Sequence, residues 1–305
     1  MDARTPLPQP GPPPLYLPFV AGPWRMAMGL VARPPEALIE IDQDYREQMA
    51  LRRRLLAERR GDVLASLPCS ATARQALLDL LARHLAEHYP RWFELGGPSF
   101  RNHLIDETWD LANTARDPLE IAGRLVQEDL CLVEPGPAGP LLTAAVLCFP
   151  SRWSLAAKLG RPLAEIHGPV PFYAGRLAAP VDRFTARLKP GHLVERFNWS
   201  IHDDPALFQP SGHGATEPRQ VVTAENAGEK MWFRVERQTL SRLPRTEAIL
   251  FTIKTYRHQL AEVVRTPSVA SRLAAAVRAL PEETARYKSL IAYRATLLAF
   301  LDALA

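Results

Sequence analysis

Cysteine is scarce in this chain of 305 residues, which contains only Cys69, Cys131 and Cys148. Three scattered thiols are too few for a disulfide framework or for a paired-thiolate zinc site. They also cannot ligate an iron–sulfur cluster, which usually takes four cysteines. We therefore expect each cysteine to be a small buried hydrophobic residue in a reducing, cytoplasmic environment.

Long apolar runs are absent as well. No stretch reaches the roughly 18 consecutive apolar residues that a membrane-spanning helix needs. The first residues, MDARTPLPQPGPPPLYLPF, lack the basic start and the apolar core of a signal peptide. The sequence therefore predicts a cytoplasmic protein that has no membrane partner.

Charge of one sign does not dominate the chain. The 37 Lys and Arg residues are spread along it and leave a net charge of only +4. They do not alternate with aromatic residues as they would along a nucleic-acid groove, so we expect no nucleic-acid partner. The dinucleotide motif GxGxxG, the Walker loop and the GxSxG elbow are also missing, which leaves those three chemistries without their usual sequence support.

The N-terminal part of the chain predicts helices. Apolar residues make up 47% of the whole sequence, which is enough for a sizeable core. Residues 5–18 are so rich in proline that they predict an extended tail or an arm that wraps the body. Helical spacing of apolar residues then predicts helices over 35–60, 70–90 and 118–127.

The second half of the chain changes character and predicts a sheet. Its first apolar run, LLTAAVLCF, is compact and typical of a buried strand, and three later segments alternate apolar and polar residues. Two helices and a long polar loop are predicted between these strands, and helices follow them. In chain order the predicted elements are a strand at 141–149, helices at 153–166 and 172–188, a strand at 194–201, a loop at 205–230, strands at 232–240 and 249–256, and helices at 268–305 with a break at Pro281.

The strand at 232–240 carries charge on both of its faces. Arg234, Glu236 and Gln238 share one face, while Arg237 shares the other with apolar neighbours. At least one of these charges then points inward, where it needs a partner or a ligand. The alternative is an edge strand whose charges prevent aggregation.

Two histidine patterns are candidates for metal binding. The segment His84-Leu85-Ala86-Glu87-His88 matches the HxxEH pattern of a zinc protease, but cationic residues at a helix C-terminus are also favoured by the helix dipole, so a chance match is the alternative. The segment EIHGPVP places His167 at the end of a predicted helix, because a proline disfavours helical backbone in the residue before it. His167 is then either a rigidly held ligand or a C-terminal capping residue.

Several longer stretches together resemble one family. The chain is similar to the haem-binding α-subunit family of haem-dependent oxidative N-demethylase over most of residues 25–265. The stretches that carry the resemblance are RMAMGLVARP, IEIDQDYREQMALRRRLL, CFPSRWSLAAKLGRPLAEIHGPVPFY, VERFNWSI and FRVERQTLSRLPRTEAILFTIKTY.

The resemblance implies an α+β fold of the Per-ARNT-Sim (PAS) type. In such a fold an antiparallel sheet and short helices clasp a haem, with further helices at both ends of the chain. His167 matches the histidine of the family's IHxPVP motif and is implied to be the proximal ligand of the haem iron. The implied regions are a tail at 1–24, a mainly helical part at 25–125, a PAS-like core at 126–265 and C-terminal helices at 266–305.

The resemblance also implies an activity and partners. It implies the oxidative N-demethylation of a small methylated amine such as dimethylamine with O2. The electrons are implied to come from NADPH through FMN and 2Fe–2S centres on a separate reductase subunit. Formaldehyde, or its adduct on a folate-binding subunit, is the implied co-product.

Charge logic then assigns residues to the haem pocket. Glu236 is expected to bind the cationic amine, Arg237 to steady bound oxygen, and Asn198 to donate a hydrogen bond to it. The expected cofactor-binding residues besides His167 are Arg234, Arg196 and Trp153. Two alternatives remain open. One is a haem-binding PAS sensor without turnover, and the other is a paralogue that has lost the metal.

Overall fold

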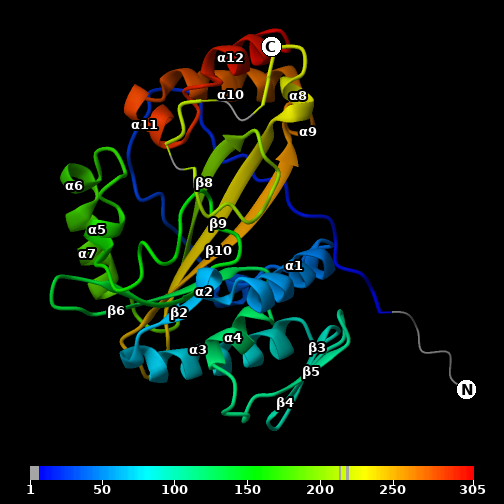
Figure 1. Cartoon of the computed structure of the whole chain (residues 1–305), viewed down its shortest axis with the longest axis vertical. Coiled ribbons are helices and arrows are strands. Elements are labelled where there is room, and N and C mark those ends of the chain that lie inside the picture. The colour runs from blue at the N-terminus through cyan, green and yellow to red at the C-terminus, as the bar shows by residue number, and fades with distance from the viewer. Residues whose placement is uncertain (1–6, 213, 218–219) are drawn as a thin grey trace, which may run out of the picture.

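A seven-stranded antiparallel sheet runs through the middle of the molecule (Figure 1). The structure is a computed structural model and describes residues 7–212, 214–217 and 220–305. Across the sheet the strands follow the order β1 (Val31–Arg33), β8 (Leu193–His202), β9 (Trp232–Arg242), β10 (Ile249–Gln259), β6 (Asp129–Glu134), β7 (Leu141–Val146) and β2 (Leu64–Ser66). The predicted α+β class with an antiparallel sheet is therefore confirmed.

Side chains that alternate along each strand give the sheet two different faces. On β6, Leu130 and Leu132 pack into the core beside the N-terminal helices, whereas Cys131 and Val133 pack into a separate cluster on the opposite face. Strand β9 lies between β8 and β10, so the edge-strand interpretation of its charges is wrong.

One face of the sheet is covered by the N-terminal helices. They are α1 (Tyr45–Glu58), α2 (Arg60–Val63), α3 (Ala71–His88) and α4 (Pro118–Gly123), and the turns η1 (Pro35–Leu38) and η2 (Pro68–Ser70) precede α1 and α3. Their fully buried leucines form the largest core with β6 and β7. A small second sheet of β3 (Phe93–Gly96), β4 (Ser99–Asn102) and β5 (Glu107–Asp110) lies beside α3 at the bottom of Figure 1.

The other helices form two groups. On the left of Figure 1 lie α5 (Leu163–Ile166), α6 (Tyr173–Arg176) and α7 (Ala178–Arg187). At the top lie α8 (Ala227–Lys230), α9 (Leu260–Val263), α10 (Pro267–Ala279), α11 (Glu282–Tyr287) and α12 (Arg294–Asp302). The C-terminal group packs on the upper ends of β8, β9 and β10 through a second hydrophobic core.

Residues 7–30, which we call the N-terminal arm, lie along the body of the molecule (Figure 1). The Trp92 Nε1 donates to the carbonyl oxygen of Pro8 at 2.7 Å, and the Gln43 amide donates to that of Gly11 at 2.8 Å. Phe19 is only 2% exposed and packs in the C-terminal core. Of the two predictions for the proline-rich segment, the wrapping arm is therefore confirmed for the described residues.

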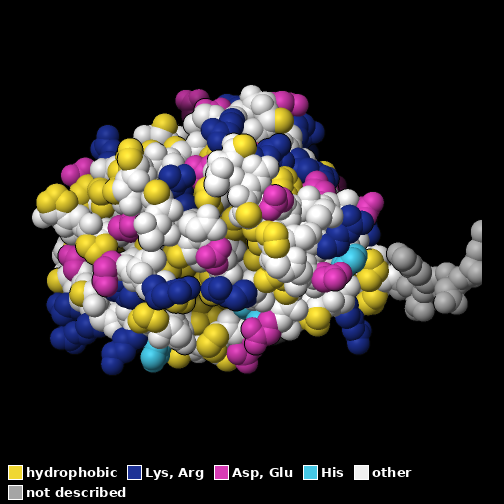
Figure 2. All heavy atoms as spheres, turned by 90° about the horizontal axis from the view of Figure 1, so that it is seen from below, with side chains coloured by type: hydrophobic (Ala, Val, Ile, Leu, Met, Phe, Trp, Pro, Cys, Tyr) yellow, Lys and Arg dark blue, Asp and Glu magenta, His cyan; other side chains and the backbone are white. Residues whose placement is uncertain are grey.

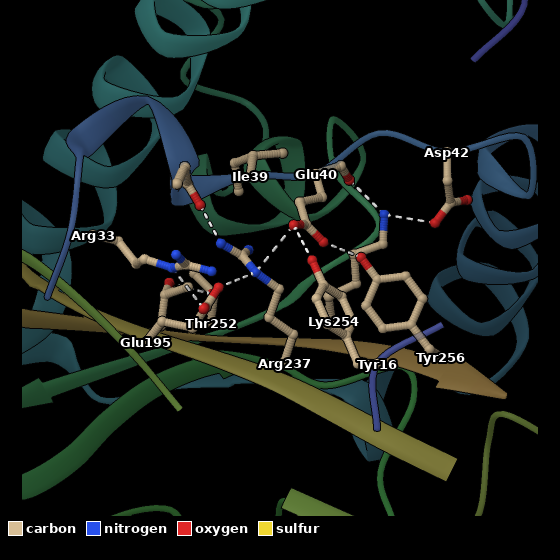
Figure 3. A network of polar contacts seen from close by, with 12 residues as sticks. Tyr16, Arg33, Ile39, Glu40, Asp42, Glu195, Arg237, Thr252, Lys254 and Tyr256 are labelled. Carbon is tan, nitrogen blue, oxygen red and sulfur yellow. Dashed lines mark hydrogen bonds and ion pairs between the residues drawn. The ribbon is translucent and has the colours of Figure 1, made fainter. Parts of the chain in front are cut away.

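A network of buried charges joins the arm to the face of the sheet that the N-terminal helices cover (Figure 3). Glu40 accepts hydrogen bonds from Tyr16 at 2.7 Å and from Tyr256. Arg237 Nε lies 3.3 Å from a Glu40 carboxylate oxygen, and Lys254 Nζ lies close to the backbone of the same residue. Because each of these groups would be costly to bury alone, the network fixes the arm on the sheet.

Several sequence predictions need correction. Residues 153–162 are not helical, and only Leu163–Ile166 forms a helix in that segment. The region up to residue 125 holds strands as well as helices, and β1 and β2 form the two edges of the main sheet. Cys131 and Cys148 are buried as expected, but Cys69 is exposed.

No helix among the described residues is long and apolar enough to cross a membrane. On the face shown in Figure 2, basic and acidic side chains are interspersed among apolar ones, so no charge of one sign covers that face.

Candidate functional site

A large cavity lies on the face of the sheet opposite the N-terminal helices. Its volume is about 880 Å³, within the range of roughly 300–1,000 Å³ that is usual for ligand pockets. Strands β6 to β10 form one wall, helices α5 to α7 a second, and residues 18–28 of the N-terminal arm a third. Helix α11 and the residues that follow it close the upper end.

His167 lies on the wall formed by α5 to α7 and lines this cavity. It is the C-terminal cap of α5, as the two prolines after it predict. Its Nδ1 lies 2.8 Å from the Leu163 carbonyl oxygen, and its ring stacks on Tyr173 with centroids 4.7 Å apart. Because a carbonyl only accepts, Nδ1 carries the proton and Nε2 carries the lone pair.

The environment of His167 keeps its imidazole neutral. Burial lowers the pKa of His167 to about 4, and the positive charges of Lys158 and Arg196 act in the same direction. The hydrogen bond to Leu163 opposes this shift without cancelling it. A neutral imidazole with a fixed tautomer is the form that binds a metal ion.

A polar strip crosses the wall that β8 and β9 form. Glu236 Oε2 accepts from Gln238 Nε2 at 2.9 Å and from Asn198 Nδ2 at 3.3 Å. Asn198 stands opposite Glu236 in the strand register, and its Oδ1 accepts from Lys288 Nζ at 3.0 Å. Both of these donors bind Oε2, and no described residue donates a hydrogen bond to Oε1. Because Glu236 lines the cavity, Oε1 is left to accept a hydrogen bond from a bound molecule.

Basic side chains surround this single carboxylate. Of the described residues that line the cavity, Glu236 is the only acidic one, and Arg196, Lys158 and Lys288 each interact with it electrostatically. Burial lowers the pKa of Arg196, and its Nε has no hydrogen-bond partner among the described residues. Lys158 Nζ lies 4.3 Å from the centroid of the Trp153 ring. The cavity therefore carries a surplus of positive charge.

The structure does not bring two of the predicted arginines to the cavity. Arg237 lies on the opposite face of β9, is 1% exposed, and holds Glu195 at 2.5 Å (Figure 3). Arg234 shares the cavity face of β9 with Glu236, but its guanidinium lies beyond the cavity and donates to the Phe149 carbonyl oxygen at 2.6 Å. Strand alternation and backbone partners explain both placements. The five other candidates, His167, Glu236, Asn198, Arg196 and Trp153, all line the cavity.

Sequence reasoning missed other residues of the site. Lys158, Lys288, Arg152 and His202 all line the cavity, and Arg152 forms an ion pair with Asp203 at 3.0 Å. The scarcity of lysine was the one available signal: the chain contains only five lysines, and two of them, Lys158 and Lys288, line the cavity. No local pattern connects the residues, which come together only through the fold.

The HxxEH pattern is not supported as a metal site. The rings of His84 and His88 lie 4.6 Å apart on α3, and burial together with the charge of His88 lowers the pKa of His84 to about 4. No group of three or more His, Cys, Asp or Glu side chains suited to a metal ion occurs in the described part of the chain. The pattern is therefore best explained as a chance match.

A comparison with known protein families matches most of the chain. The family model described as haem-dependent oxidative N-demethylase, alpha subunit-like, matches residues 29–298. The matched range contains every strand of the main sheet and every cavity residue named above except the wall formed by residues 18–28. It leaves out most of the N-terminal arm.

Proposed function

Because the chain belongs to the haem-dependent oxidative N-demethylase alpha subunit-like family, we propose that it removes a methyl group from a small methylated amine such as dimethylamine, with O2 as oxidant. The methyl carbon leaves as formaldehyde or as a folate adduct. The observation that carries this proposal is the neutral His167 imidazole in the wall of the 880 Å³ cavity, with its Nε2 lone pair available.

The donor set fits a haem in two respects. His167 would hold the haem iron through Nε2, and the Leu163 carbonyl supplies the acceptor that such a ligand needs on its other nitrogen. The surplus positive charge suits the two propionate groups of a haem, and it includes Arg196 Nε, which has no hydrogen-bond partner among the described residues. We propose Arg196, Lys158 and Trp153 as the residues that hold the cofactor with His167.

The sheet supplies the apolar part of the cofactor site. Leu142, Leu240, Phe251 and Ile253 line the cavity from β7, β9 and β10. Because the sheet forms one wall of the cavity and helices α5 to α7 form another, we propose residues 126–265 as a PAS-like core that would hold the haem between sheet and helices. When bound, haem iron supplies the electron-transfer and dioxygen chemistry that side chains do not provide.

Glu236 is the proposed binding residue for the amine. A secondary amine is cationic at neutral pH, and Oε1 can accept a charge-assisted hydrogen bond from its N–H group. Gln238 and Asn198 hold the carboxylate through Oε2, so its orientation is fixed before the substrate arrives. Asn198 is thus proposed to position Glu236, because its amide is already engaged by Glu236 and Lys288.

Electrons have to come from another protein. The alpha-subunit-like family implies an assembly of several subunits. Two of the three cysteines are buried and the third lies on the surface, which does not suit an iron–sulfur cluster in this chain. We propose a reductase subunit with FMN, a 2Fe–2S centre and NADPH as the electron donor, and a folate-binding subunit as the acceptor of the one-carbon unit.

A haem titration tests the proposal. The full chain is titrated with haem while its Soret absorption is recorded, and dimethylamine is then added. We expect one haem per chain, a spectrum that changes with the amine, and a much weaker or altered Soret band in His167→Ala. His192→Ala is the matched control, because His192 is exposed and lies outside the cavity lining.

Two results would contradict the proposal. Equal haem spectra in His167→Ala and His192→Ala would show that His167 is not the ligand of the haem iron. A haem-loaded protein whose spectrum ignores dimethylamine and other small methylated amines would favour the PAS-type sensor instead.

A further inference from the structure

Lys288 occupies an unusual position at the upper end of the cavity. It follows α11, and its Nζ donates to the Trp199 carbonyl oxygen at 2.6 Å and to Asn198 Oδ1 at 3.0 Å. Nζ also lies over the Trp199 ring, 5.4 Å from its centroid. Two acceptors therefore fix the amine, and the cavity borders it on the remaining side.

This arrangement suits an uncharged amine. A neutral amine has two N–H groups and one lone pair, so two acceptors satisfy it and leave the lone pair free. No described carboxylate lies within ion-pair distance of Nζ, and the acid that influences it, Glu236, is reached only through Asn198. Burial lowers the pKa of Lys288 to about 8, Glu236 opposes this shift, and Arg196 adds to it.

We propose that Lys288 is a covalent capture site for the small aldehyde that the demethylation releases. This inference rests on the proposed function, because an oxidised N-methyl group leaves as formaldehyde inside the same cavity. A fixed amine that borders the cavity would meet the aldehyde before it reaches solvent.

The capture step is an ordinary imine formation. The Nζ lone pair attacks the aldehyde carbon, a C–N bond forms, and the C=O bond becomes the C–OH bond of a carbinolamine. With one proton from solvent the hydroxyl leaves as water and an iminium remains, which keeps one N–H group for Asn198 or Trp199. Hydrolysis returns lysine and aldehyde, and an amine acceptor can instead take the carbon by transimination. No electrons are exchanged in these steps.

Lys158, the other lysine in the cavity, is less suited to this role. Burial lowers its pKa as well, but no described hydrogen-bond acceptor fixes its Nζ, which lies over the Trp153 ring at 4.3 Å. It is also placed among the cations proposed to hold the propionates. The geometry therefore favours Lys288.

Reductive trapping in the full-length, haem-free chain tests the proposal directly. The protein is exposed at neutral pH to limiting isotope-labelled formaldehyde with cyanoborohydride, which converts each imine into a methylated lysine. Peptide mass spectrometry then gives the initial labelling rate of each of the five lysines in one sample. The exposed Lys189 serves as the internal reference, so the comparison needs no variant.

The expected result is labelling of Lys288 at least about 10-fold faster than that of Lys189. A pKa near 8 gives roughly 250 times more neutral amine than an ordinary lysine pKa of about 10.4. The Trp199 ring opposes this by favouring the cation, by up to about one pKa unit, and lower basicity also reduces nucleophilicity. Lys288→Arg should lose the fast label and leave the labelling of Lys189 unchanged.

Labelling of Lys288 no faster than that of Lys189, or fast labelling of Lys158 in its place, would overturn the proposal. The trapping uses supplied formaldehyde and no haem, so it is independent of the proposed function. If Lys288 is labelled fast but the chain does not bind haem, the capture site is supported and the proposed demethylase function is contradicted. If the chain is a demethylase but Lys288 is labelled slowly, the function is supported and the capture site is contradicted.

Discussion

Replacing Glu236 by Gln is the sharpest test of how the cavity binds an amine. Glutamine keeps one side-chain oxygen for the hydrogen bonds from Asn198 and Gln238, so the strip on β8 and β9 should remain in place. The change removes the only acidic group among the described lining residues. A hydrogen bond to a charged group contributes about 1.5–3 kcal/mol. The loss should therefore weaken dimethylamine binding roughly 10- to 150-fold.

The assay is calorimetric titration of the haem-loaded protein with dimethylamine, alongside the same titration with a neutral ether of similar size. In Glu236→Gln the Kd for the amine should rise, while the Kd for the ether should stay the same or fall. Haem content and thermal unfolding should match those of the unchanged protein, since no proposed haem contact is altered. An equal Kd for the amine in both proteins, or an equal rise for amine and ether, would refute Glu236 as the ammonium-binding group.

Two further predictions concern the fold. Asp129→Leu should lower the free energy of unfolding in urea by about 3–5 kcal/mol, because it removes the carboxylate that lies 2.8 Å from the fully buried Arg52 and leaves that charge with carbonyl partners alone. A shift below about 1 kcal/mol would show that Arg52 finds other partners. The pKa of His84 is lowered to about 4 in the folded chain, against about 6.5 when unfolded, so the unfolded state binds more protons between these values. Stability should therefore fall as the pH drops from about 6.5 to 4, by up to about 3 kcal/mol from this group, and urea titrations of His84→Gln should show a shallower pH dependence.

The sequence predicts elements well where the signal is local. The side-chain pattern predicts strands at 194–201, 232–240 and 249–256, and the structure confirms all three as β8, β9 and β10, which are ten or eleven residues long. The stop at His167 is equally local, since Pro169 and Pro171 forbid a longer helix whatever the rest of the chain does.

Elements held by distant contacts escaped prediction. Residues 153–162 are predicted to be helical, yet the Arg152 amide just before them donates to the Gln209 carbonyl oxygen at 2.7 Å and the Gly160 amide donates to that of Leu142 at 2.9 Å. These backbone hydrogen bonds to distant residues replace those of a helix, and no nearby residue in the sequence predicts them. Strands β1 and β2 have three residues each, which is too short for a periodic pattern.

The residues of the site also differ in how far the sequence predicts them. Glu236 and Asn198 are recognisable because each is a polar residue in a strand with a strong pattern, and the antiparallel register then sets them side by side. Lys288 lies at the end of a C-terminal helix, far along the chain from both, and only the docking of that helix group places its amine on Asn198. Arg237 is predicted to belong to the site but does not, because its charge alone does not indicate which face of β9 it occupies.

The proposed cofactor and the proposed substrate of this cavity carry opposite charges. Its basic residues suit an anionic cofactor, but the proposed substrate is a cation that those residues repel. Propionates bound to Arg196 and Lys158 would cancel that part of the repulsion and leave Glu236 free to hold the ammonium group. Lys288 would then be the cation that contacts Asn198 beside Glu236, and burial lowers its pKa to about 8. Loss of its proton would reduce the repulsion of the amine and would also create the nucleophile, so the two proposals together predict that this one lysine helps the amine to bind and then captures the product.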